Sequence, residues 1–172
     1  MKQGLKRDQI MNEKSATEIA IRYARRDELD EVNRIRLQVN DLHVNGRPDI
    51  FRAGFCDELK NHVYEKFDAE DSDVIVALED QEIVGFASLE YIKRPESAYC
   101  LARSMYRVEE FGVDENHRRK GIGRKLIAWI GDDARQKGFD RVDLDMFQFN
   151  ESALKFYEEI GFTTYRRYME WK

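Results

Sequence analysis

The order in which two kinds of hydrophobic spacing follow one another is the strongest constraint on what this chain folds into. Short alternating runs predict strands at residues 19–23, 73–78, 82–92, 104–113, 141–147 and 162–171. Apolar residues three and four apart predict helices at residues 27–39, 51–67, 121–137 and 152–160. This order is typical of a mixed α/β domain, in which helices pack on the faces of one central sheet.

Residues 1–17 precede this pattern and have no sustained periodicity of their own. We therefore expect a flexible N-terminal tail, residues 1–17, followed by a single domain, residues 18–172. The chain carries 29 Lys and Arg against 34 Asp and Glu, a net charge of −5. The tail has four cations and two anions, so the domain itself carries −7. An acidic domain disfavours nucleic acid and anionic membranes as partners.

The same composition bears on compartment and metal content. No apolar stretch is long enough to cross a membrane, and the first residues lack the hydrophobic core of a secretory signal. We therefore expect a cytoplasmic protein without a membrane partner. The 3 His are scattered and the 2 Cys form no pair with ligand spacing, so no metal is expected.

The segment FGVDENHRRKGIGRKL joins a predicted strand to an amphipathic helix and contains the most informative motif. Gly121 and Gly123 lack side chains, so backbone N–H groups there can approach a ligand closely. They lie at a helix start, where unpaired N–H groups and the helix dipole attract anions. Five cations surround them: Arg118, Arg119, Lys120, Arg124 and Lys125. This combination predicts a phosphate or diphosphate site.

Other interpretations of this motif are weaker. Leu126 stands where a dinucleotide-binding motif has its third glycine, and the chain contains no P-loop motif. A basic patch for nucleic acid is an alternative, but two glycines inside it serve no purpose in a run of charge.

The motif, together with a second one, resembles the GNAT superfamily of N-acetyltransferases, which bind acetyl-CoA. The family's [Q/R]xxGxG/A turn is matched by Arg118, Gly121 and Gly123. Its second element, an Asn, an Ala and FYxxxGF, is matched by Asn150, Ala153, Phe156, Tyr157, Gly161 and Phe162. Arg119 stands at a common glycine position, and the usual proline after the fourth strand is absent. The resemblance implies a mixed α/β central sheet of about six or seven strands, about four flanking helices, and fourth and fifth strands that splay apart.

The resemblance also implies how acetyl-CoA is bound. The backbone of the turn would hold the diphosphate, and the end of the fourth strand would pair with the pantetheine arm. Asn150 matches a pantetheine-contacting asparagine; a helix N-cap is its alternative role, and both can hold together. The implied cofactor-binding residues are Phe111, Gly112, Val113, Arg118, Arg119, Lys120, Gly121, Ile122, Gly123, Arg124, Asn150 and Tyr157.

For catalysis, Tyr157 matches the family's general acid, which protonates the departing CoA thiolate. An ordinary phenol is fully protonated at pH 7, so it can donate a proton without any shift of its pKa. The alternative role of Tyr157 is that of an aromatic side chain in the hydrophobic core. The attacking amine must lose a proton, and Glu109, Glu110 or a water relay could accept it. Adjacent strand residues point to opposite faces, so we expect only one glutamate to face the substrate. The family's usual spacing from Val113 favours Glu109.

In this family the acceptor site lies largely between the first two helices, which makes His43 and Phe51 candidates, with Asp145 as an acidic one. The acidic domain favours a small cationic amine. The expected activity is direct acetyl transfer from acetyl-CoA to a primary amine through a ternary complex. A peptide or protein amine is an alternative acceptor, and a non-catalytic acyl-CoA-binding sensor is an alternative function.

The last predicted strand carries three aromatic residues, Tyr165, Tyr168 and Trp171. They suggest either a homodimer edge or burial in the core of the domain.

Overall fold

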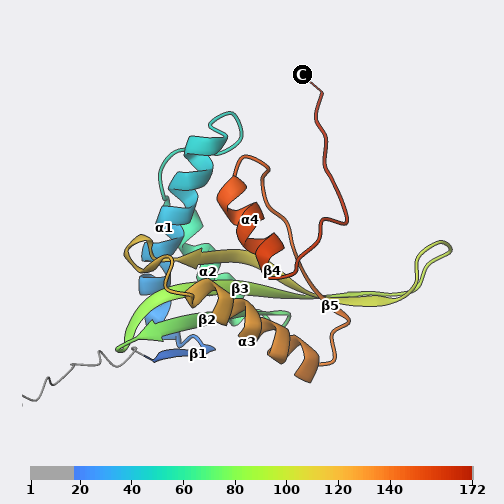
Figure 1. Ribbon diagram of the computed structural model, residues 1–172, viewed down its shortest axis with the longest axis horizontal. Coiled ribbons are helices and arrows are strands. Elements are labelled where there is room, and N and C mark those ends of the chain that lie inside the picture. Colours follow the sequence, from blue (N-terminus) through green and yellow to red (C-terminus); the bar gives the residue numbers. More distant parts are fainter. Residues whose placement is uncertain (1–17, 172) are drawn as a thin grey trace, which may run out of the picture.

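The computed structural model of this protein describes residues 18–171. The expected N-terminal tail, residues 1–17, lies outside the described residues. Within the described part of the chain, one mixed sheet has helices on both faces (Figure 1), which confirms the α/β class.

The sheet has five strands, β1 (Ile19–Tyr23), β2 (Ser72–Glu79), β3 (Glu82–Arg94), β4 (Arg103–Val113) and β5 (Arg141–Leu144). They lie in the order β1-β2-β3-β4-β5, and β4 and β5 are the one parallel pair of the described ladders. The helices are α1 (Leu29–Gly46), α2 (Asp57–Asp68), α3 (Ile122–Gln136) and α4 (Glu151–Glu159). Short 3-10 turns occupy Arg26–Glu28 and Glu115–His117. Helix α3 connects β4 to β5, because parallel neighbours need a crossover.

Two hydrophobic clusters hold the layers together. On one face, α1 and α2 pack against β2 through Val74 and Val76. On the other, Ile75 and Ala77 of the same strand face α3, because successive strand residues point to opposite faces. A sheet covered on both faces explains why the strands are nearly continuous apolar runs.

The expectation of six or seven strands is wrong for the described residues, which form five. Residues 162–171, expected as a strand, belong to no helix or strand. Their alternating pattern fits a strand, but a strand also needs a partner, and none within the described chain pairs with this segment.

Other differences are at element ends. The second helix begins at Asp57 and not at residue 51, since the backbone turns at Gly54, whose φ of +96 is left-handed. The first helix continues to Gly46, and β5 ends at Leu144.

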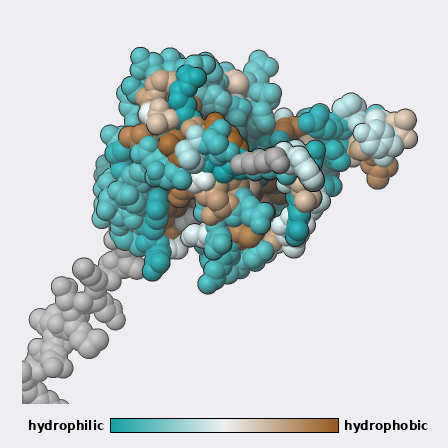
Figure 2. Space-filling view, turned by 90° about the horizontal axis from the view of Figure 1, so that it is seen from above, coloured by the Kyte–Doolittle hydropathy of each residue, from teal (hydrophilic) through white to brown (hydrophobic). Residues whose placement is uncertain are grey.

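Strands β3 and β4 extend past their neighbours as a two-stranded arm, paired as far as Arg94 and Arg103. This arm projects from the body of the molecule in Figure 2. In the loop that joins its strands, Tyr99 and Leu101 are exposed. Among the described helices, none is both long and apolar enough to cross a membrane.

Candidate functional site

The predicted anion site lies where β4 leads into α3. Gly121 caps α3 with a left-handed φ of +80, and a side chain there would meet no atom within 4 Å. The backbone N–H groups of residues 119–124 donate to no acceptor in the described part of the chain. The five surrounding cations are exposed, and Lys120 alone among them forms a salt bridge, to Glu79 at 3.2 Å. Unpaired donors, positive charge and open space are what a diphosphate needs, so these residues fit that group.

Arg119 adopts a φ of +63, which is left-handed and uncommon for a residue with a side chain. This is the position at which the resembled family commonly has glycine. The Arg119 N–H is still available, so arginine in place of glycine at this position strains the backbone but removes no hydrogen-bond donor.

A groove of about 680 Å³ leads from this turn to the start of α4. Residues of α1 form one wall, and Arg118, Phe149 and Asn150 contribute to the other. The Asn150 side chain accepts a hydrogen bond from the Ala153 N–H at 3.1 Å, which confirms the N-cap role. Its contact with pantetheine stays a prediction.

Helix α1 and the loop before α4 approach very closely at the end of this groove. A Cβ added to Gly46 would lie 2.1 Å from Cε2 of Phe149, so only glycine allows this contact. Gly46 and Phe149 both line the groove, so this contact is part of its wall.

Strand β4 has an open edge next to the groove. It pairs with β5 from Met105 to Val108 and then continues to Val113 without a strand on that side. The ring of Phe111, in this open stretch, lies 6.1 Å from Phe156 and 6.2 Å from Tyr157. The site therefore brings β4, the α3 turn and α4 together, since a Cβ on Gly123 would meet Phe156 at 3.1 Å.

Tyr157 is 9% exposed, and burial raises the pKa of its phenol to about 12. Its hydroxyl has no hydrogen-bond partner among residues 18–171. Tyr157 therefore presents a neutral hydroxyl, available as a donor, beside the open edge of β4.

The expectation that Glu109 and Glu110 point to opposite faces is wrong, because β4 contains a β-bulge. Ser88 pairs with Glu110 and Leu89 pairs with Val108, so Glu109 is the extra residue. A bulge inserts one residue into the alternation and turns both glutamates toward one face.

The partners of the two carboxylates agree with this geometry. Arg36 of α1 donates to both oxygens of Glu110, at 2.7 and 2.8 Å. Glu109 lies 2.8 Å from Nζ of Lys66 and 3.6 Å from Nε2 of His62, both on α2. Because α1 and α2 cover the same face of the sheet, both glutamates lie on that face.

The candidate acceptor residues fall into two places. His43 and Phe51 lie in one aromatic cluster with Phe147 and Phe149, with ring centroids 5.0 to 6.0 Å apart. His43 Nδ1 donates to the Val39 carbonyl oxygen at 2.9 Å, which leaves Nε2 as an acceptor in the neutral ring. Asp145 is not part of this cluster; it is exposed in the loop after β5.

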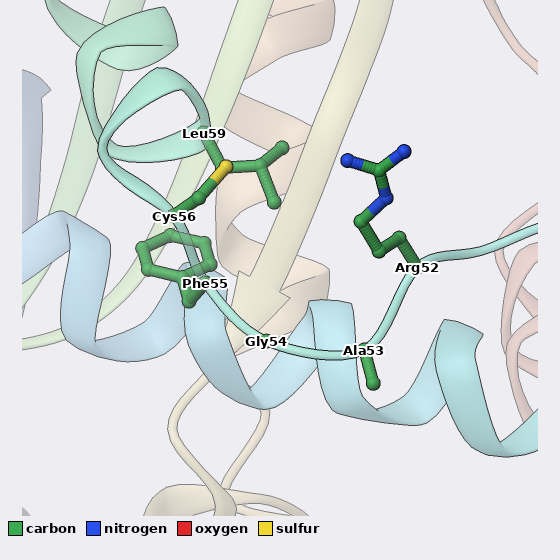
Figure 3. A pocket seen from close by; sticks show the side chains of 6 residues that line it. All are labelled: Arg52, Ala53, Gly54, Phe55, Cys56 and Leu59. Atoms are coloured by element: carbon green, nitrogen blue, oxygen red, sulfur yellow. The ribbon is translucent and has the colours of Figure 1, made fainter.

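A smaller pocket of about 260 Å³ lies in the connection between α1 and α2. Figure 3 shows the side chains of Arg52 and Leu59 directed into the same space, with Phe55 at its border. The centroid of the Phe55 ring lies 5.6 Å from the guanidinium carbon of Arg36. This pocket therefore adjoins the Arg36–Glu110 ion pair.

Several residues that shape the site were not expected from the sequence. Arg36 is 3% exposed, and its position within the apolar stripe of its helix was a signal of a buried ion pair. Asp114, at the end of β4, accepts hydrogen bonds from Arg34, Gln38 and His117. Burial opposes ionisation of Asp114, but these hydrogen bonds outweigh it and hold the pKa of its carboxyl well below the usual range.

A mixed sheet, a turn with unpaired N–H groups before α3 and a buried tyrosine beside an open strand edge are the features expected of an acyltransferase fold. The protein-family model described as "Acetyltransferase (GNAT) family" matches residues 20–162, and the chain belongs to this family.

The chain is similar to curated members of the family over part of their length. It is 31% identical over 72 residues to L-ornithine N5-acetyltransferase NATA1 of Arabidopsis thaliana, covering 42% of this chain and 30% of that protein. It is 30% identical over 95 residues to streptothricin acetyltransferase of Streptomyces lavendulae, covering 55% and 46%. The chain thus spans less than half the length of these relatives.

Solved structures match over nearly the whole described chain. The tetramutant of the BH1408 protein from Bacillus halodurans has a TM-score of 0.85 at 28% identity, covering 89% of this chain and 99% of that one. AAC(6')-Iy in complex with a bisubstrate analog has a TM-score of 0.71 at 20% identity, covering 91% and 98%. These matches agree with the GNAT fold of the sheet and its helices.

Proposed function

We propose that this protein transfers an acetyl group from acetyl-CoA to a primary amine of a small cationic molecule, by direct transfer through a ternary complex. The observation that carries the proposal is the junction of the unpaired N–H groups at residues 119–124 with the hydroxyl of the buried Tyr157 along the open edge of β4. Bound acetyl-CoA would supply its acetyl group as a thioester that a neutral amine can attack.

The residues that would hold the cosubstrate form one continuous path. Backbone N–H groups from Arg119 to Arg124 would donate hydrogen bonds to the diphosphate, and the side chains of Arg118 and Lys120 would add positive charge. The open edge at Phe111, Gly112 and Val113 would pair with the pantetheine arm, as an added strand does. Asn150 lines the same groove as Arg118, and only the side-chain oxygen of Asn150 is used in the N-cap, so its amide nitrogen is available to the arm.

Tyr157 would donate its proton to the departing sulfur. A phenol with a pKa of about 12 stays protonated throughout the physiological pH range, so Tyr157 always carries the proton that it would donate. Because its hydroxyl has no partner within the described chain, donation breaks no existing hydrogen bond.

We infer that Glu109 is the base and retain Glu110 as the alternative. Arg36 occupies both oxygens of Glu110, whereas Lys66 contacts one oxygen of Glu109 and His62 lies next to the other. The His62 imidazole can pass a proton to solvent. Water could complete the path between the amine and Glu109.

The acceptor would bind on the face covered by α1 and α2, against His43 and Phe51, with Asp145 as a counter-charge. The names of two relatives specify small amine-bearing acceptors, ornithine and streptothricin, which supports a small molecule over a protein. The net acidic domain favours a cation by weak electrostatics.

The test is a panel of amines assayed for release of the CoA thiol, with diamines, aminosugars and a peptide N-terminus as members. We expect turnover with a small cationic amine and loss of turnover in Tyr157→Phe. Binding of acetyl-CoA without thiol release from any amine would favour the sensor instead. Absence of acetyl-CoA binding by calorimetry would overturn the whole proposal.

A further inference from the structure

Arg52 is a cation without a partner on the connection between α1 and α2. Its guanidinium forms no ion pair or hydrogen bond with the residues that the structure describes. The arginines that precede it in the described chain each contact a carboxylate; they are Arg22, Arg25, Arg26, Arg34, Arg36 and Arg47. Asp57, a short distance further along the chain, pairs with Lys60 at 3.0 Å. The charge of Arg52 is therefore available to a ligand.

Arg52 is also the charged residue of a pocket. It lines the space of about 260 Å³ described above, together with Ala53, Gly54, Phe55, Cys56 and Leu59. Figure 3 shows its guanidinium directed into the same space as the side chain of Leu59. The lining thus combines one positive charge with apolar walls, and it includes no carboxylate that could neutralise the charge.

This pocket lies close to the proposed site of proton transfer. The centroid of the Phe55 ring is 5.6 Å from the guanidinium carbon of Arg36, and Arg36 lies 2.7 Å from Glu110. Glu110 directly precedes Phe111, where β4 has its open edge. A small molecule in the pocket would therefore lie near the strand along which the thioester is expected.

The charge of the pocket selects among amines. A polyamine carries only ammonium groups, and Arg52 would repel any of them that entered the pocket. A carboxylate would instead form charge-assisted hydrogen bonds with the planar guanidinium. One arginine matches the single charge of a carboxylate, whereas a phosphate dianion calls for more than one cation.

We propose that the acceptor is an amino acid with an amine on its side chain, and that Arg52 binds its carboxylate. This inference rests on the proposed function and names the substrate class within it. Such a molecule has two ammonium groups and one carboxylate, so it is still a cation, as the acidic domain favours. Its methylene groups would lie against Phe55 and Leu59, and its side-chain amine would extend toward the glutamates of β4.

The test compares matched acceptors that differ in the carboxylate. L-lysine and L-ornithine are paired with cadaverine and putrescine, which are the same chains without the carboxylate, and release of the CoA thiol gives KM and kcat. We expect the parent to prefer the amino acids. Arg52→Ala should raise their KM about 5- to 30-fold at nearly unchanged kcat, the effect of a charge-assisted hydrogen bond partly screened by solvent. The KM of the diamines should stay the same or fall, because a repelling charge is removed.

Arg94→Ala provides the control. Arg94 is exposed at the end of the arm formed by β3 and β4 and has no partner among the described residues, so it matches Arg52 in charge and exposure. Its removal should leave the KM of all four acceptors unchanged. An equal rise of KM in both variants would mean that the effect is one of net charge, and it would overturn the role of Arg52.

Two other results would overturn the proposal while leaving acetyl transfer intact: a parent enzyme that prefers the diamines, or an amino-acid KM that is the same in the parent and in Arg52→Ala. If no amine is turned over, the proposed function fails, and the pocket is then tested by binding alone. Calorimetry with CoA present should show L-lysine or L-ornithine binding to the parent, with a Kd about 5- to 30-fold higher in Arg52→Ala. Binding that is absent, or that does not depend on Arg52, refutes the carboxylate site.

Discussion

Gly121 and Gly138 lie just outside the two ends of α3 and make a matched pair for testing the diphosphate site. Both are left-handed, with φ of +80 and +74, and a Cβ on either would meet no atom within 4 Å. The Gly121→Ala and Gly138→Ala variants therefore bear the same backbone strain without a steric clash. That strain is worth about 1 kcal/mol, so each should lower Tm by roughly 2–4 °C.

The two variants should differ in their affinity for acetyl-CoA. Gly121 lies within the six unpaired N–H groups of residues 119–124, and a methyl group there would hold a diphosphate away from them. Loss of one hydrogen bond to a charged group costs about 1.5–3 kcal/mol. We expect Kd to rise roughly 10- to 150-fold in Gly121→Ala and to stay within about twofold of the parent in Gly138→Ala.

Isothermal titration with acetyl-CoA gives the affinities, and thermal unfolding without ligand gives the two Tm values. Unchanged affinity in Gly121→Ala would refute the assignment of the diphosphate to this turn. An equal loss in both variants would mean that the effect comes from destabilised α3 and not from a lost contact with the ligand.

Three further changes have distinct expected outcomes. Tyr157→Phe should lower kcat about 10²- to 10⁴-fold at unchanged KM for acetyl-CoA and nearly unchanged Tm, and steady-state kinetics with normal kcat would exclude the acid role. Gly46→Ala should force the Phe149 ring aside, since the added Cβ would lie 2.1 Å from Cε2 of Phe149. The free energy of unfolding should fall by about 1–3 kcal/mol in urea titrations, and an unchanged midpoint of urea unfolding would contradict this packing. The hydrogen bond from Arg22 lowers the pKa of Glu28 from 4.5 to about 2, so its stabilisation is full above pH 4.5 and is lost as pH falls toward 2. Glu28→Gln should therefore lower Tm at pH 7 and converge with the parent near pH 2, and a constant difference in Tm across that range would argue against the ion pair.

The parts of the fold that follow from local spacing could be predicted from the sequence. Strand and helix order, the turn at Gly121 and the N-cap at Asn150 each depend on residues close together in the chain. Apolar period and capping chemistry are encoded within a few residues, so they can be inferred without knowledge of the tertiary structure.

The parts of the fold and of the site that depend on contacts between residues far apart in the chain could not be predicted from the sequence. The cluster of His43 with Phe147 joins residues on different elements, and neither position alone indicates the other. The segment 163–171 has a strand's composition, but a strand forms only where an edge is offered, and the chain's own β5 does not pair with it. The bulge at Glu109 is one extra residue in a long strand and has no local sequence signal.

That bulge has a specific consequence for the proposed chemistry. Before it, Tyr106 and Val108 face α3; after it, Phe111 and Val113 face α3, so the alternation shifts by one residue. Without the shift, Glu110 would face α3 and Phe111 would face α1.

With the shift, β4 has Glu109 and Glu110 on the face of α1 and α2 and packs against Tyr157 on the face of α4. The edge between these faces is the one that β5 leaves open beyond Val108. In the proposed reaction the amine would lose its proton on one face and the sulfur would gain one on the other, so acid and base would not neutralise each other directly. Glu109→Ala keeps the bulge and removes the proposed base, so it should lower turnover while it retains the fold and the affinity for acetyl-CoA. Turnover at the parent rate in Glu109→Ala would show that Glu109 is not the base.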